Sequence, residues 1–484
     1  MKNDISNNFE DFNNFILEKM KEWAIPGMTV GIIKDGEIIY SNGLGLRDVN
    51  KNLKTTENTL FAIGSASKSF TTLAIGILVD EGKLDLDTPI KKYMHSFEMH
   101  NKYAEEHLTL RDMLCHRSGL PRHDALWYNS SLSRKELVDR IKYLEFSKDF
   151  RETWQYNNLM YATAGYIIEL ITGLTWEEFV KIRILEPLGM TNTNFSVDVS
   201  KKSADFSQPY SQQRDKIHQK NFRNIDALGP AGSINSNLTD MLKWLNLHLN
   251  KGNLNGKQII SEKNISQLHS PQVPCQLFPF KFDELQFLSY GLGWFIESYR
   301  GKKHVNHGGG IDGFCSYTSF LPDENIGIVI LSNLDNPFCT MPIAYHIYDN
   351  ILGYDYIDWN KKLKTEGAKM FKAIEGANEA VINSKKGITT PSHSFEDYTG
   401  LYEHLGYGSL KIETKDNSLK LTYNNIEYIL SHKCYDIFTM TMMEYYVIDV
   451  TFDYDRNGNI KSVSIPFEQS VKEIVFIKCK EDFH

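Results

Sequence analysis

The stretch Phe61–Leu78, FAIGSASKSFTTLAIGIL, joins a polar turn to an apolar helix. Its apolar residues recur at helical spacing, at Phe70, Leu73, Ala74, Ile77 and Leu78. Gly82 follows where such a helix would end. Residues three apart share one helical face, so Ser65 and Lys68 are expected within hydrogen-bonding reach in the first turn.

This pair of side chains indicates acyl transfer. A lysine with a pKa lowered by desolvation can accept the proton of a serine hydroxyl, which is a poor nucleophile without such a base. The N–H groups of a first helical turn can stabilise an oxyanion. The alternative is structural: Ser65 caps the helix and Lys68 is solvated.

The overall composition is that of a folded, soluble protein. The 484 residues exceed the usual size of one hydrophobic core, which predicts more than one domain. The net charge of -8, with no run of five Lys or Arg, argues against nucleic acid as a partner. No stretch approaches eighteen apolar residues and the first fifteen residues are polar, so we expect no membrane span, no export signal and a cytoplasmic protein. A chain whose export signal had been removed would give the same pattern.

No motif calls for a metal or an organic cofactor. The six cysteines form no CxxC or metal-ligand spacing. Residues 453–458 match the first half of an EF-hand loop, but Ser464 stands at the twelfth position and the flanks favour strands, so a hairpin turn is predicted. The glycines 308–310 lack the Lys-Ser/Thr of a phosphate-binding loop.

Periodicity predicts the order of elements along the chain. We expect a helix over 7–23, a hairpin turning at Asp35-Gly36, helices over 161–171 and 239–249, and an interior strand over 327–333. Residues 360–384 are helix-prone, and beyond about residue 390 apolar residues alternate as in β-hairpins. The predicted domains are a hydrolase domain over 1–355, a helical linker over 356–389 and a β-barrel over 390–484.

Several blocks of the sequence resemble one known superfamily. FAIGSASKSFTTLAIGILVDEGKLDLDTPI is similar to the nucleophile segment of serine β-lactamases and penicillin-binding proteins, on the class C side that includes esterases and D-aminopeptidases. Further blocks follow in the family's order: IPGMTVGIIKDGEIIYSNGLG, LTLRDMLCHRSGLP, WQYNNLMYATAGYIIELITG, EPLGMTNT, GPAGSINSNLTDMLKWL, YGLGWFI and HVNHGGGIDGFCSYTSFLPDENIGIVILSN. The resemblance implies an α+β, β-lactamase/transpeptidase-like fold, with an antiparallel sheet flanked by helices and an all-helical subdomain. The C-terminal part resembles a lipocalin-like barrel.

The resemblance also implies roles for individual residues. Ser65 would be the nucleophile and Lys68 its proton acceptor. Tyr156, the first residue of the Y-x-N motif, would move protons to the leaving group, with a pKa lowered by a neighbouring cation. Asn158, the third residue, would contact Lys68 and the substrate carbonyl. His116 is expected to be structural.

The third family motif departs from its usual form. K-[ST]-G is replaced by His307-Gly308-Gly309, and histidine offers no fixed positive charge for a substrate carboxylate at neutral pH. The resemblance implies that His307, Gly309 and Gly310 bind substrate, and the family pattern places an oxyanion N–H on Gly310, while the glycines allow close approach. The change favours esters and amides over β-lactams.

Three functions remain open at this stage. The first is a serine hydrolase acting through an acyl-enzyme on small esters or amides, as a carboxylesterase or a D-amino-acid peptidase or amidase. The second is a penicillin-binding D,D-peptidase or weak β-lactamase, and the third is a non-catalytic binding protein on the same scaffold. A small-molecule substrate is expected, and the oligomeric state is not predicted. Specificity is expected in loops such as 124–133 and 208–226.

Overall fold

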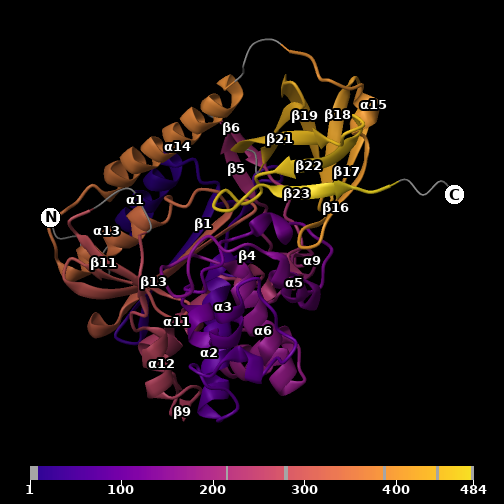
Figure 1. The fold of residues 1–484 in the computed structure, drawn as a ribbon. Coiled ribbons are helices and arrows are strands. Elements are labelled where there is room, and N and C mark those ends of the chain that lie inside the picture. Colours follow the sequence, from indigo (N-terminus) through magenta and orange to yellow (C-terminus); the bar gives the residue numbers. More distant parts are fainter. Residues whose placement is uncertain (1–8, 214–215, 277–281, 385–388, 443–445, 481–484) are drawn as a thin grey trace.

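The computed structural model describes residues 9–213, 216–276, 282–384, 389–442 and 446–480. The architecture is α+β: a large antiparallel sheet with helices on both faces, a helical region beside it, and a closed barrel formed by the C-terminal strands (Figure 1). The expected fold class is confirmed.

The large sheet has nine strands in the order β10-β11-β12-β13-β14-β15-β1-β2-β3. Their bounds are β1 Gly27–Lys34, β2 Glu37–Asp48, β3 Leu53–Lys54, β10 Val273–Pro274, β11 Leu285–Tyr290, β12 Phe295–Tyr299, β13 Lys302–Ile311, β14 Phe314–Leu321 and β15 Ile326–Ser332. The β1–β2 turn is the predicted two-residue hairpin, with positive φ at Asp35 (53°) and Gly36 (83°). As predicted, β15 is an interior strand and is buried along its whole length.

The α-helices surround this sheet and fill the helical region. Their bounds are α1 Phe9–Glu22, α2 Ser67–Asp80, α3 Lys102–His107, α4 Leu110–Leu114, α5 Arg134–Arg140, α6 Asn158–Thr172, α7 Trp176–Val180, α8 Glu186–Leu188, α9 Val197–Ser200, α10 Gly229–Gly232, α11 Leu238–Leu249, α12 Glu262–Leu268, α13 Met341–Leu352, α14 Trp359–Asn383 and α15 Phe395–Tyr398. The predicted helix over 161–171 begins three residues earlier, because the Asn157 side chain caps it, and it ends at Gly173 as expected. No helix in the described ranges is long and apolar enough to cross a membrane.

Each face of the sheet is closed by its own set of helices. On one face the backbone of β1 and β15 lies directly under α11, where a side chain at Gly31 would meet Leu238 and Leu242 at under 3 Å. On the other face, β-strand residues such as Ile328 form one core with α1 and α13. Helix α2 lies inside the helical region, and its residues Ser67–Leu78 are all buried. The turn that precedes α2 is therefore held in a fixed position.

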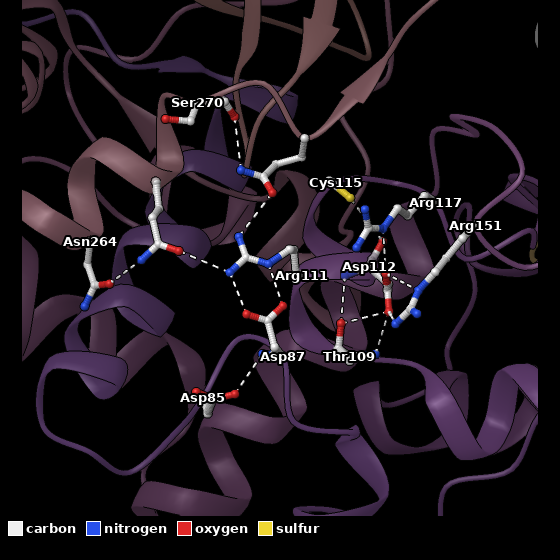
Figure 2. Close-up of polar contacts among 12 residues, drawn as sticks. Asp85, Asp87, Thr109, Arg111, Asp112, Cys115, Arg117, Arg151, Asn264 and Ser270 are labelled. Atoms are coloured by element: carbon white, nitrogen blue, oxygen red, sulfur yellow. Dashed lines mark hydrogen bonds and ion pairs between the residues drawn. The ribbon is translucent and has the colours of Figure 1, made fainter.

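A buried carboxylate ties together two segments of the helical region (Figure 2). Asp112 is fully buried and accepts hydrogen bonds from Arg117 (2.6 Å) and Arg151 (2.8 Å), and it closes the capping box with Thr109 at the start of α4. These contacts lower the pKa of Asp112 although its burial opposes them. They hold the loop after α4 against the loop that leads to Tyr156, since the Arg151 N–H also donates to the carbonyl of Arg117.

The C-terminal strands close into an eight-stranded antiparallel barrel. They are β16 Gly400–His404, β17 Gly408–Lys415, β18 Ser418–Tyr423, β19 Ile426–Cys434, β20 Ile437–Met442, β21 Tyr446–Tyr454, β22 Ile460–Ile465 and β23 Ile474–Lys478. The long helix α14 leads to it, and Figure 1 shows the barrel lying over the helical region. The segment that resembled an EF-hand forms the β21–β22 connection, where Asp455 accepts hydrogen bonds from the N–H groups of Asn457 and Asn459. Three two-stranded pairs complete the fold: β4 Phe61–Ala62 with β7 Asn235–Ser236, β5 Tyr210–Gln213 with β6 Lys216–Gln219, and β8 Asn253–Leu254 with β9 Lys257–Gln258.

Candidate active site

Ser65 lies in a single 3₁₀ turn, Gly64–Ala66, that leads into α2. Neither this turn nor α2 has a side-chain cap, so the structural alternative of Ser65 as a capping residue does not apply. The glycine-rich end of β13 passes directly beside the turn. A Cβ on Gly309 would lie 1.9 Å from the carbonyl oxygen of Ile63, and a Cβ on Gly64 would lie 2.9 Å from the backbone nitrogen of Gly310. Only glycine at 309 allows this approach.

Lys68 is fully buried directly behind Ser65. Its Nζ lies 3.2 Å from Ser65 Oγ and donates to Asn158 Oδ1 and to the carbonyl oxygen of Ala231, both at 2.8 Å. Burial, and after it the charge of Arg122, lowers the pKa of Lys68 well below its ordinary value. The amine therefore loses its proton at a lower pH than an exposed lysine does.

The orientation of Asn158 is fixed by a second carboxylate. Asn158 Nδ2 donates to Asp124 Oδ1 (3.0 Å), so its amide oxygen faces Lys68. Asp124 also accepts from Trp127 Nε1 (2.7 Å) and from Arg122 Nε (2.5 Å). A continuous chain of hydrogen bonds therefore runs from Arg122 through Asp124 and Asn158 to Lys68.

Tyr156 lies between the side chains of Lys68 and Arg122. Lys68 Nζ is 4.7 Å and Arg122 Cζ is 5.1 Å from the centroid of its ring. Burial nevertheless raises the pKa of Tyr156, while its hydrogen bond with Ser65 and the Arg122 charge act in the opposite direction. The expected lowering of this pKa is wrong, because desolvation of the phenolate outweighs the charge of Arg122. The Tyr156 hydroxyl is therefore protonated and can donate a proton.

His307 lies behind the site rather than on its surface. It is 2% exposed, its Nε2 is 2.9 Å from the Tyr290 hydroxyl, and its Nδ1 is 2.6 Å from the Gly308 carbonyl oxygen. Burial, and next the nearby Lys68, lowers the pKa of His307 to about 3, so this imidazole is neutral. The residue that replaces the family's lysine therefore brings no positive charge to the site.

His116 supports the loop that carries Tyr156. It is fully buried with φ at 63°, and its Nδ1 accepts the N–H of Asn157 at 3.0 Å. Its carbonyl oxygen accepts the N–H of Gln155 at 2.7 Å. Together with Asp112 and its two arginines (Figure 2), His116 fixes the backbone on both sides of Tyr156.

Ser65 opens onto a cavity of about 610 Å³. Gly310 and Asn158 line it beside Ser65, whereas Gly309 and His307 do not. Three ion pairs stand around its walls: Arg122 with Asp124, Arg223 with Asp312, and Lys220 with Asp335. Residues of the barrel form the remaining wall, including Asn424, Ile426, Tyr428 and Met442.

The sequence and the structure agree on part of this arrangement. The structure brings Ser65, Lys68, Tyr156 and Asn158 together, with Gly310 beside them, and places His307 and Gly309 in the layer behind. Residues of the loops 124–133 and 208–226, where specificity is expected, line the cavity, but sequence reasoning missed Arg122 and the contact of Asp124 with Asn158, and it named no barrel residue. The charged residues directly after SGLP, in PRHD, were the available signal for the first two.

Metal-binding groups and disulfides do not contribute to the described part of the site. Among the residues that the structure places, no three His, Cys, Asp or Glu side chains gather as metal ligands would. The six cysteines are free thiols, four of them buried.

Comparison with protein families divides the chain into two matched parts. Residues 12–347 match the Beta-lactamase family, and residues 384–478 match a domain of unknown function (DUF3471). Helix α14 lies between the two matched parts.

Relatives and solved structures cover most of the chain at low identity. Unguisins hydrolase ungD' of Aspergillus campestris is 26% identical over 98% of this chain and 92% of its own length. Protein flp of Staphylococcus aureus is 27% identical over 68% of this chain and 64% of its own length. The octameric penicillin-binding protein homologue of Pyrococcus abyssi superposes with a TM-score of 0.61 at 23% identity, covering 97% of this chain and 100% of that one. A class C β-lactamase of Rhodobacter sphaeroides has a TM-score of 0.56 at 20% identity, covering 71% of this chain and 99% of its own.

Proposed function

We propose that this chain, which belongs to the beta-lactamase family of serine hydrolase-type proteins, hydrolyses small esters or amides through an acyl-enzyme on Ser65. Within the superfamily we place it on the class C side, with the carboxylesterases and D-amino-acid peptidases or amidases. In this proposal residues 1–355 carry the chemistry, residues 356–389 form the linker, and residues 390–484 form the appended, lipocalin-like barrel.

The hydrogen bonding of Lys68 carries the proposal. A neutral amine has two N–H donors and one lone pair. Lys68 Nζ donates to Asn158 Oδ1 and to the Ala231 carbonyl and lies 3.2 Å from Ser65 Oγ, so in the neutral form of the amine the lone pair would face Ser65 Oγ. This is the arrangement in which lysine accepts the serine proton as the oxygen attacks a carbonyl carbon.

The remaining groups around Ser65 suit the later steps. Ser65 and Gly310 both line the cavity, and their backbone N–H groups would stabilise the oxyanion. Tyr156, protonated and in contact with Ser65, would donate its proton to the leaving group, and Lys68 would restore it. Hydrolysis of the acyl-enzyme would use a water molecule activated from the same side.

The charges of the site favour substrates whose binding does not depend on a carboxylate group. His307 is neutral and buried, and each cationic side chain on the cavity wall is paired with an acid. Among the described residues that line the cavity, a β-lactam or a peptide C-terminus would find no unpaired positive charge of the kind that the K-[ST]-G lysine offers. The name of the 26% identical relatives, unguisins hydrolase, supports a hydrolytic activity.

Labelling and turnover test the proposal together. A fluorophosphonate probe should label the wild type and not Ser65→Ala, while equal labelling of both would remove Ser65 as nucleophile. Short p-nitrophenyl esters compared with D-amino-acid p-nitroanilides then distinguish esterase from D-peptidase. Stoichiometric labelling by a fluorescent penicillin would instead establish the D,D-peptidase alternative. Absence of both labelling and turnover, with binding of a peptide or glycan, would establish a non-catalytic protein.

A further inference from the structure

The barrel is fixed rigidly to the segment that orients Asn158. Asn424 and Asn425 form the β18–β19 turn, both with positive φ (47° and 60°). Asn424 Nδ2 donates to the carbonyl oxygen of Ala125 at 2.8 Å, and the Asn424 carbonyl accepts from Asn129 Nδ2 at 2.7 Å. Ala125 directly follows Asp124, so the wall that the barrel adds has a defined position relative to Ser65.

Other contacts hold the barrel to the helical region on both sides of this turn. His123 Nδ1 lies 2.7 Å from the Tyr407 hydroxyl, and the His123 N–H donates to Glu468 Oε2 at 3.0 Å. Arg140 donates to the carbonyl oxygen of Gly406 at 3.1 Å. The barrel and the helical region share one continuous hydrophobic core. The barrel is therefore packed firmly against the cavity rather than loosely tethered.

The barrel side of the cavity carries apolar and aromatic side chains beside the polar Asn424, Glu427 and Thr441, whereas the other walls carry the three ion pairs. Ile426 and Tyr428 on β19 and Met442 on β20 are half-buried and line the cavity; we name these three residues the barrel subsite. Trp127 and Tyr128 line the same cavity from the helical region. Burial raises the pKa of Tyr428, which keeps its hydroxyl neutral. Binding is favoured when an apolar group of a ligand covers such a surface, because apolar area is removed from water.

We propose that the barrel subsite binds a bulky apolar or aromatic group of the substrate, several bonds away from the scissile carbonyl. The cavity volume is typical of pockets that hold ligands much larger than an acetyl ester. The proposal rests on the proposed hydrolase function and adds the class of substrate: esters or amides with an extended apolar arm. The C-terminal barrel is then a determinant of specificity in the same site.

Neighbouring residues on β19 provide matched variants. Tyr428 lines the cavity, whereas Ile429 follows it on the outer face of the barrel and is 52% exposed. Two substrate pairs separate the acyl and leaving-group sides: p-nitrophenyl 4-phenylbutanoate with p-nitrophenyl acetate, and 4-phenylbutyl acetate with ethyl acetate. Tyr428→Ala should lower kcat/KM for the extended member of one pair by about tenfold, from loss of buried aromatic surface, and for the short member by less than about twofold.

Controls separate a specific effect from misfolding. Tyr428→Phe should keep the preference of the wild type, and Ile429→Ala should change neither substrate pair, with thermal melts showing that the variants are folded. If Tyr428→Ala lowers both members of each pair equally, or neither, the subsite is wrong while the hydrolase function stands. If the wild type hydrolyses no ester and Ser65 is not labelled by a fluorophosphonate, the proposed function and the subsite fail together.

Discussion

Replacing Arg122 by glutamine should move the acid limb of the pH profile to higher pH. Lys68 must be neutral to accept the serine proton, so kcat/KM falls as the pH drops through the Lys68 pKa of the free enzyme. Arg122 is one of the causes that hold this pKa down. Its removal also leaves the charge of Asp124 without its ion pair, which raises the Lys68 pKa further. Both effects have the same sign.

The geometry sets the size of this shift. Lys68 Nζ and Arg122 Cζ lie 4.7 and 5.1 Å from the Tyr156 ring centroid, so they are at most about 10 Å apart. At an effective dielectric constant of about 20, two unit charges at this separation repel by roughly 1.7 kcal/mol. The Arg122 side chain is 52% exposed, and solvent screening reduces the effect to about one pH unit.

The assay is kcat/KM for an activated ester between pH 4.5 and 9 at constant ionic strength. Arg122→Gln should shift the acid limb upward by about one unit, whereas Arg122→Lys, which keeps the charge, should shift it by about a third of a unit or less. An unmoved limb in Arg122→Gln would refute the coupling of Arg122 to the catalytic base. An equal shift in both variants would show that the effect comes from altered packing rather than charge.

Three further perturbations test how the site is held. Gly309→Ala should lower kcat/KM at least a hundredfold, because the new Cβ would lie 1.9 Å from the Ile63 carbonyl oxygen, and Gly376→Ala, on the open surface of α14, should leave the same ester assay unchanged. Asp112→Asn should lower the free energy of unfolding at pH 7 by about 2–3 kcal/mol in urea titrations. Because folding lowers the pKa of Asp112, the difference in stability between the wild type and Asp112→Asn should shrink as the pH falls below about 4. A difference that does not change with pH would contradict a role for the Asp112 charge. Asn424→Ala should lower the melting temperature by a few degrees and weaken discrimination between long and short esters; an unchanged preference would show that this turn does not position the barrel wall.

Local sequence patterns predicted the elements but not their electrostatics. The SxxK spacing predicted the contact of Ser65 with Lys68, and alternation after residue 390 predicted the barrel strands, because both depend on neighbours within one element. The raised pKa of Tyr156 depends on burial, to which His116 and Tyr290 contribute from distant segments.

The role of Asp124 was hidden for the same reason. Its contact with Asn158 requires a left-handed residue at His123 (φ 47°) and a loop held by a turn some 300 residues further along the chain. Likewise, the motif position of His307 indicated a substrate-binding residue, but only the packed sheet shows that Tyr290 and Gly308 occupy both of its ring nitrogens. Spacing in sequence identifies which residues meet within an element, and tertiary packing decides their charge and exposure.

The cavity wall that β18, β19 and β20 contribute, with Tyr423, Tyr428 and Met442 among its residues, has a consequence for biosynthesis. Ser65, Lys68 and the glycines of β13 are synthesised well before β18 and β19. A nascent chain can therefore bring Ser65 and Lys68 together while the barrel wall of the cavity is still missing. Selectivity is completed only when the last strands emerge and the barrel closes. The order of synthesis therefore separates the appearance of chemical competence from the appearance of substrate choice.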